Sequence, residues 1–337
     1  MTSAADTATA PDEDVPLPRE SRARTIAGFA VSVIAIAGCV WWASRQDSPR
    51  FPEGVGNWVL LVVAAGVYGA ATIIRGARWD AILRYLHVFH ARVDAYALTA
   101  VGYMGNTVLP ARGGEVLRIF LLAERSHARR REVLGSIITE RLLDVAALGG
   151  LFVVLTVSGA AEAPGGDATM YGAIGALILG VGAAFAYLRL RVAGKFESFA
   201  DRVRPITRAS RQLLTVRGAQ LLLVTMCVWA LEGAIMWLAA QAIDVPLGIG
   251  EGLVVVVLAS LSALIPAGPG YVGTYDAAAL FALHQVDVRG GAAVSTILLF
   301  RFVVFVPITV AGLVLMIGRY GGLRGALSRE RAAEAPA

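Results

Sequence analysis

Charged residues are scarce in this sequence, and cysteine and histidine are scarcer still. Asp, Glu, Lys and Arg make up 16% of the 337 residues, whereas hydrophobic residues make up 57%. The mean hydropathy is +0.66. So little charge excludes an ordinary soluble domain and is typical of a polytopic membrane protein, in which runs of ~20 apolar residues cross the bilayer.

The two cysteines and four histidines form no pattern that binds a metal or makes a disulfide. Cys39 and Cys227 lie in separate apolar segments without CxxC spacing, so we expect two buried thiols. His87 and His90 share a basic loop without a convincing third ligand. The sequence also lacks a GxxxxGK[ST] motif, which excludes a recognisable ATP-driven motor within the chain. We therefore predict no cofactor and no metal.

Basic residues are distributed in short loops between apolar runs rather than along one continuous surface. The net charge of +5 is therefore better explained by the positive-inside rule than by nucleic-acid binding. This rule predicts a multi-pass protein of the cell membrane with both termini in the cytoplasm, and no nucleic-acid partner.

The alternation of apolar runs and basic loops predicts an all-α polytopic membrane protein, an inverted repeat whose units each contain a re-entrant broken-helix hairpin. Six full spans are expected, at 25–43, 58–74, 133–157, 170–188, 219–243 and 292–317. The predicted segments are a disordered cytoplasmic tail (1–24), a transmembrane helix with an external loop (25–57), a first repeat (58–157), a connecting span with a basic cytoplasmic loop (158–219), a second repeat (220–317) and a cytoplasmic tail (318–337).

Residues 93–123 interrupt an apolar run with a proline, paired glycines and three charges. Pro110, Gly113 and Gly114 break helical hydrogen bonding, and charges at membrane depth are costly unless they pair or line a cavity. Basic loops flank this segment on both sides, so the chain enters and leaves on the cytoplasmic side. The loop before it is predicted to begin directly after Ile74 and to contain Arg75, Arg78, Arg84 and Arg92. The sequence therefore predicts a re-entrant helical hairpin.

A second break lies in 252–284. The stretch Asn106–Gly114, NTVLPARGG, aligns with Ser262–Gly270, SALIPAGPG, at an offset of 156 residues. Charge bias places the first hairpin on the inside and the second on the outside, which gives the two halves inverted topology. In such repeats the substrate site lies near the midplane, between the discontinuous helices.

Several charged residues lie deep within predicted spans. Glu140 and Asp144 share a helix face, and Arg141 lies three residues before Asp144. They are either an internal salt-bridge network or the wall of a polar cavity. Arg301, in the last span, either pairs with Asp276 or Glu232 or holds substrate phosphate.

Helix N-termini after Gly114 and Gly270 add partial positive charge, which favours an anionic group. We predict a substrate site without catalytic residues. The candidate substrate-binding residues are Arg112, Gly113, Gly114, Glu115, Arg118, Glu140, Arg141, Asp144, Gly270, Tyr271, Tyr275, Asp276 and Arg301.

Three motifs in this order, GNTVLPARGGEVLR (105–118), ITERLLDV (138–145) and IPAGPGYVGTYDAA (265–278), resemble the lysylphosphatidylglycerol synthase transmembrane-region family, also described as flippase-like. The resemblance implies a membrane domain that moves lipids or lipid-linked groups between leaflets. Bifunctional members of that family carry a large cytosolic aminoacyl-transferase domain after this region. Here residues 318–337 follow it, so we do not expect synthase activity.

The leading hypothesis is a flippase-like transporter of an anionic phospholipid or a lipid-linked phosphate. Arg112, Arg141 and Arg301 would hold the phosphate. One alternative is a membrane-embedded enzyme that transfers a group onto a lipid, with Glu115, Glu140 or Asp144 as a base. Another is a structural or assembly subunit. The expected partners are a membrane lipid and, as a candidate, a separate lipid-modifying enzyme.

Overall fold

The structure is a computed structural model that describes residues 50–109, 112–126, 128–158, 215–262 and 269–321. These residues form helices and no strand, which confirms the predicted all-α class. Several predicted segments lie outside the described residues. They are the tail 1–24, the spans 25–43 and 170–188, most of the basic loop after 188, and 322–337.

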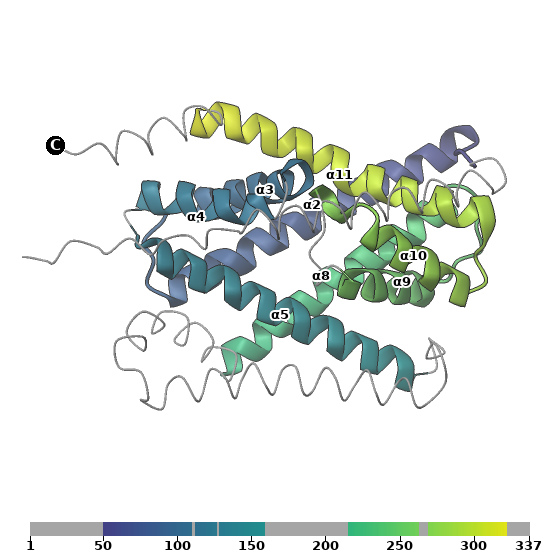
Figure 1. The fold of residues 1–337 in the computed structure, drawn as a ribbon, viewed down its shortest axis with the longest axis horizontal. Helices are drawn as coiled ribbons and strands as arrows, with labels where there is room; N and C mark the ends of the chain where they lie inside the picture. The colour runs from purple at the N-terminus through teal and green to yellow at the C-terminus, as the bar shows by residue number, and fades with distance from the viewer. Residues whose placement is uncertain (1–49, 110–111, 127, 159–214, 263–268, 322–337) are drawn as a thin grey trace, which may run out of the picture.

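Long helices run along the length of the molecule (Figure 1). They are α2 (Gly54–Tyr85), α5 (Arg130–Val157), α8 (Val216–Gln241) and α11 (Gly290–Tyr320). Within the described residues, α2, α8 and α11 are long and apolar enough to cross a membrane. Their outward-facing side chains, such as Val62, Leu223 and Val314, are exposed hydrophobics that suit a lipid environment. The chain is therefore a membrane protein.

Helix α2 continues past the predicted end of its span. The sequence places Arg75 and Arg78 in a cytoplasmic loop, and this prediction is wrong, because the helix runs on to Tyr85 and buries both residues. No proline interrupts the segment, and both arginines find acidic partners inside the protein, which offsets the cost of burying their charge. The helix ends where His87 adopts a left-handed φ of 58°.

The prediction of a buried thiol at Cys227 is also wrong. Its side chain is exposed on α8, because an apolar helix at the edge of a membrane protein can turn one face toward lipid instead of toward the core. Cys39 lies outside the described residues.

Two pairs of short helices occupy the predicted hairpin segments. The first pair is α3 (Arg92–Val108) and α4 (Gly113–Ser126), and the second is α9 (Ile249–Ser262) and α10 (Thr274–Gln285), which is preceded by the 3₁₀ turn η2 (Pro269–Tyr271). The members of each pair pack against each other. Figure 1 shows α3 and α4 in one half of the molecule and α9 and α10 in the other. The helices thus break where the sequence predicts, although Pro110 and Pro266 themselves lie outside the described residues.

Glycine allows the two helices of the first hairpin to approach closely. A Cβ atom on Gly114 would lie 1.8 Å from the carbonyl oxygen of Gly102 and 2.6 Å from the backbone nitrogen of Asn106. Both neighbours are backbone atoms, so no side chain can move aside to make room. The contact between α3 and α4 therefore depends on the absence of a side chain at residue 114.

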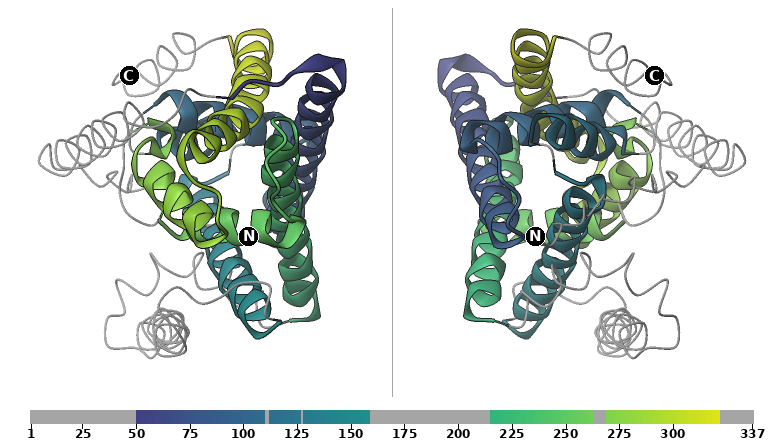
Figure 2. Two further views of the ribbon diagram at one scale, coloured as in Figure 1. Left: turned by 90° about the vertical axis from the view of Figure 1, so that its right-hand side faces the viewer. Right: turned by 90° about the vertical axis from the view of Figure 1, so that its left-hand side faces the viewer.

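The packing of the helices repeats between the two halves. Helix α11 packs against α3, and its counterpart α5 packs against α9. In the same way α2 packs on α3 as α8 packs on α9, while α4 contacts α5 as α10 contacts α11. Seen end on, α2 and α8 lie side by side, and α5 converges on α8 (Figure 2). The order and packing of the helices agree with a repeat, and its inverted membrane topology stays a prediction.

Helix α11 connects the two hairpins. Its N-terminal half contains Arg301, which binds the second hairpin, and its C-terminal half contains Gly312, where a Cβ atom would lie 2.4 Å from the Cβ of Met104 in α3. Pro307 lies between these two contacts, inside the helix.

We predict that Gly114→Ala destabilises the protein, whereas Gly66→Ala does not. The first substitution forces two backbones apart and should cost about 1–3 kcal/mol. Gly66 lies on an exposed face of α2, where no atom lies within 4 Å of the position that a Cβ would occupy, so the second should be neutral or slightly stabilising. Thermal unfolding in detergent would measure both, and equal melting temperatures would contradict the close-packing argument.

The predicted opposite orientation of the two hairpins can be tested by cysteine labelling in a background without Cys39 and Cys227. Exposed residues flank each hairpin: Phe89 and Arg129 the first, Ile249 and Asp287 the second. We expect cysteines at 89 and 129 to react from the cytoplasmic side and those at 249 and 287 from the other side. If residues 89 and 129 report opposite sides, α3 and α4 do not form a re-entrant hairpin.

Candidate substrate-binding site

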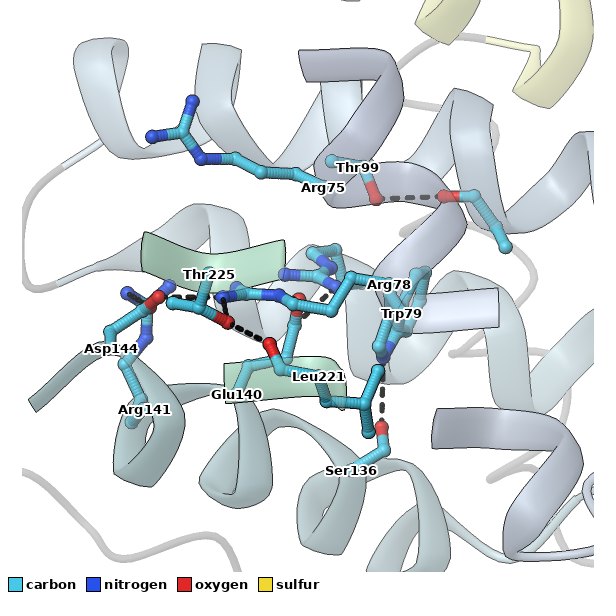
Figure 3. Close-up of polar contacts among 12 residues, drawn as sticks. Arg75, Arg78, Trp79, Thr99, Ser136, Glu140, Arg141, Asp144, Leu221 and Thr225 are labelled. Atoms are coloured by element: carbon cyan, nitrogen blue, oxygen red, sulfur yellow. Dashed lines mark hydrogen bonds and ion pairs between the residues drawn. The ribbon is translucent and has the colours of Figure 1, made fainter. Parts of the chain in front are cut away.

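A buried arginine lies at the centre of the polar network (Figure 3). Arg78 donates from Nη1 to Oδ1 of Asp144 at 2.7 Å and to Oγ1 of Thr225 at 2.9 Å, and its Nη2 lies 3.3 Å from Oε1 of Glu140. The side chain is 1% exposed. One guanidinium therefore joins α2, α5 and α8.

The other oxygen of Glu140 binds the first hairpin. Arg118 in α4 donates to Oε2 of Glu140 at 2.6 Å, and its guanidinium lies 3.9 Å from the ring centroid of Trp79. Trp79 in turn donates to Oγ of Ser136 at 2.9 Å. The cation–π contact and the two ion pairs leave the Glu140 carboxylate enclosed between arginines.

Two further arginines of the first half are more accessible. Arg141 pairs with Oε1 of Glu115 at 2.9 Å and with Oδ2 of Asp144 at 3.1 Å. Arg112 lies 3.8 Å from the same oxygen of Glu115. The side chains of Arg112 and Arg141 are 35% and 34% exposed, against 1% for Arg78. Ion pairs thus join residues 112–118 to residues 140–144. The arginines of this cluster differ in exposure, some being enclosed and others open.

Arg301 holds the tip of the second hairpin. It pairs with Asp276 and donates to the carbonyl oxygens of Gly270 at 2.9 Å and Tyr271 at 3.4 Å. Of the two predicted acidic partners, Asp276 is the one that contacts Arg301, whereas Glu232 pairs with Arg75. The fork of one guanidinium thus fixes a chain reversal in which Gly270 and Tyr271 have φ angles of 63° and 54°.

The helix N-termini at the two tips are partly satisfied by the protein itself. The backbone N–H of Gly114 donates to Oδ1 of Asn106 at 3.1 Å, and that of Gly273 donates to Oδ2 of Asp276 at 2.9 Å. Caps of this kind occupy donors that a helix N-terminus would otherwise offer to a ligand. These two backbone N–H groups are therefore already bound within the protein.

The two tips meet at a cavity of about 230 Å³. Arg112 of the first tip lies with its guanidinium 5.6 Å from the ring centroid of Tyr271 of the second, and both residues have positive φ. The charged side chains that line the cavity are four arginines and two carboxylates: Arg75, Arg112, Arg141, Arg301, Asp144 and Glu232. The aromatic side chains that line it are Tyr68, Tyr103, Trp229, Tyr271, Tyr275, Phe300 and Phe305.

About half of the candidate residues from the sequence line this cavity, and the others support them. The lining members are Arg112, Arg141, Asp144, Gly270, Tyr271, Tyr275 and Arg301. Glu115, Arg118, Glu140 and Asp276 pair with arginines or carboxylates of the network, and Gly113 and Gly114 pack at the first tip.

Sequence reasoning does not identify Arg75, Tyr103 and Trp229 as cavity residues. It places Arg75 in a loop, although the stretch from Arg75 to Leu86 keeps an apolar helical pattern without a breaker, and that signal is present in the sequence. Tyr103 and Trp229 carry no such signal, because an aromatic residue in an apolar helix looks the same whether it faces lipid, core or cavity.

These features define a class: an all-α membrane protein in which two broken helical hairpins meet at an arginine-lined cavity. The chain belongs to the family described as "Lysylphosphatidylglycerol synthase TM region", which matches residues 25–312. This match confirms the resemblance seen in the sequence motifs.

The chain is similar to two further proteins, one over most of its length and one over less than half. A "UPF0104 membrane protein" of Methanothermobacter thermautotrophicus is 20% identical over 309 residues, which are 84% of this chain and 90% of that protein. "Glycosyltransferase AglD" of Haloferax volcanii is 30% identical over 148 residues, which are 43% of this chain and 23% of the relative. The chain thus spans under a quarter of the glycosyltransferase's length. No solved structure matches the chain.

We predict that Arg78→Met strongly destabilises the protein and that Arg84→Met does not. Removing Arg78 deprives two carboxylates of a buried partner, which should cost about 3–5 kcal/mol. Arg84 forms an i,i+4 pair with Asp80 and its side chain is 51% exposed, so its loss should cost about 0–1 kcal/mol. Melting temperatures in detergent would compare the two, and a similar small loss in both would show that Arg78 does not hold the network together.

Proposed function

We propose that this protein binds an anionic phospholipid or a lipid-linked phosphate in the cavity between the hairpin tips and moves it between leaflets. The observation that supports this most directly is the set of four arginines, from α2, α5, α11 and the first tip, on one cavity. Arginine binds phosphate with a planar fork of donors and keeps its charge at any physiological pH.

The position of the cavity agrees with transport. Transporters built from inverted repeats place the substrate at the meeting point of their discontinuous helices, near the middle of the bilayer. Here the contact between Arg112 and Tyr271 joins the two breaks, one from each half. Under the predicted topology, each hairpin would enter from a different leaflet, so a substrate at the tips would be reachable from either side by moving one half against the other.

The contacts of Glu140 and Asp144, two of the three candidate bases, favour a transporter over an enzyme. A general base needs an oxygen that can accept a proton from the substrate. Both oxygens of Glu140 contact arginines, Arg78 and Arg118, and both oxygens of Asp144 contact Arg78 and Arg141. These two carboxylates are therefore better suited to hold arginines in place than to accept a proton.

The relative named as a glycosyltransferase supports the alternative of group transfer onto a lipid. Reconstitution of the purified protein into vesicles with fluorescent phosphatidylglycerol and with a labelled lipid-linked phosphate would separate the two functions. Leaflet exchange and head-group modification are measured in the same sample. Exchange without modification supports the proposal, and modification without exchange supports the enzyme.

Within this assay, we expect Arg141→Ala to slow leaflet exchange about tenfold or more, because a hydrogen bond to a charged group contributes about 1.5–3 kcal/mol. Arg289→Ala is the matched control. Its side chain is 71% exposed and pairs with Asp287 outside the cavity, so exchange should stay unchanged. Equal exchange by the two variants, at equal folded amounts in the vesicles, would remove Arg141 from the proposed site.

A further inference from the structure

Three side chains that line the cavity each contain a buried hydrogen-bond donor without a partner among the described residues. These donors are Nη1 of Arg75, Nε1 of Trp229 and the hydroxyl of Tyr275. The three side chains line the same cavity and come from α2, α8 and α10. Arg75 is 4% exposed, so bulk water does not satisfy its free nitrogen.

Unsatisfied donors of this kind are rare in folded proteins, because each costs about 1–3 kcal/mol. Here three of them belong to side chains that line one cavity. A group rich in acceptor oxygens would satisfy these donors. Both carboxylates on the wall already pair with arginines, since Glu232 pairs with Arg75 and Asp144 with two arginines. The wall is therefore suited to a ligand that accepts hydrogen bonds, and not to an ammonium group.

Arg75 is held so that one side of its fork remains available. Its Nη2 binds Glu232, and its guanidinium carbon lies 5.3 Å from the ring centroid of Tyr103 and 5.9 Å from that of Trp229. The carboxylate and the two rings orient the guanidinium before any ligand arrives. A preorganised donor loses less entropy on binding.

The charge of the network limits the charge of the ligand. Among the described residues the ion pairs in and around the cavity form three separate groups, which together contain six arginines and five carboxylates and so leave one positive charge. The arginines are Arg75, Arg78, Arg112, Arg118, Arg141 and Arg301, and the carboxylates are Glu115, Glu140, Asp144, Glu232 and Asp276. A ligand with one negative charge makes this network neutral, as a site in a low-dielectric surrounding requires.

We propose that Arg75, Trp229 and Tyr275 form a phosphoryl-binding subsite that takes a phosphodiester with a single negative charge. This inference rests on the proposed function and names the substrate class of the same cavity. The free nitrogen of Arg75 and the Trp229 and Tyr275 donors bind the two non-bridging oxygens of the phosphate. Arg112 and Arg141, which line the same cavity and are about one-third exposed, add positive charge to it.

The test measures ligand affinity of the full chain in detergent. Four probes are compared. Phosphatidylglycerol is a phosphodiester with one negative charge, and phosphatidic acid is a phosphomonoester. Diacylglycerol has no phosphate, and inorganic phosphate has no lipid. We expect phosphatidylglycerol to bind most tightly. Tyr275→Phe and Trp229→Phe should each weaken its binding about two- to tenfold, the range expected for one hydrogen bond. The binding of diacylglycerol should not change.

The ligand-free melting temperature separates a binding role from a structural one. Tyr275→Phe removes a buried hydroxyl without a partner, so the ligand-free protein should be as stable as the wild type or more stable. Tyr85→Phe and Trp58→Phe are controls of the same chemistry at residues that do not line the cavity, and they should leave affinity unchanged. A loss of ligand-free stability in Tyr275→Phe, with unchanged affinity, would overturn the subsite.

The remaining outcomes distinguish the inference from the proposed function. If phosphatidylglycerol affinity falls in Arg141→Ala but not in Tyr275→Phe or Trp229→Phe, the subsite is wrong and the proposed function stands. If phosphatidylglycerol and diacylglycerol bind the wild type equally, the anionic substrate itself is wrong. Tighter binding of phosphatidic acid would overturn the diester assignment, and binding of inorganic phosphate without binding of phosphatidylglycerol would overturn the lipid as its source.

Discussion

Arg78 carries a permanent charge that almost no solvent reaches, and the protein around it is arranged to neutralise that charge. Glu140 and Asp144 provide two carboxylates one helical turn apart, and Thr225 provides a hydroxyl. A buried guanidinium without these partners would cost several kcal/mol. The relative positions of α2, α5 and α8 are therefore restricted to those that keep all three contacts.

The arginines divide into groups with different physical roles. Arg78 and Arg118 are enclosed by carboxylates and by Trp79. Arg78 holds α2, α5 and α8 together, and Arg118 holds α4 against α5. Arg112 and Arg141 share Glu115 yet remain about one-third exposed. Arg112 and Arg141 also line the cavity, whereas Arg78 and Arg118 do not. The two interpretations left open by the sequence, a structural network and a polar cavity, thus describe neighbouring parts of one cluster.

The sequence predicts the fold best where local rules act. Proline and glycine mark both hairpin breaks, and the apolar runs mark α5, α8 and α11, because helix breaking and hydropathy depend on neighbouring residues alone. Pairings that depend on three-dimensional packing are harder to predict. The four-residue spacing of Glu140 and Asp144 indicates a common face, but nothing local shows that Arg78 lies opposite them. The predicted end of α2 is wrong for the same reason, since a basic residue looks like a loop residue until its acidic partner is known.

The unsatisfied donors at the cavity could not be found from sequence at all. Arg75, Trp229 and Tyr275 are far apart in the chain, and the free state of each depends on what the other helices leave uncovered. The sequence shows which side chains can donate a hydrogen bond, but it does not show which of them lack an acceptor in the folded protein.

Pro307 links the shape of one helix to the width of the cavity. Proline removes a backbone hydrogen bond and weakens the helix locally, so this point of α11 bends more easily than its neighbours. Arg301, on one side of it, is anchored to the tip of the second hairpin, and Gly312, on the other side, is locked against α3 of the first. The second hairpin thus contacts α11 before Pro307, and the first hairpin contacts it after Pro307. A bend of α11 at Pro307 would therefore change the separation of the two hairpins, although Pro307 itself does not line the cavity.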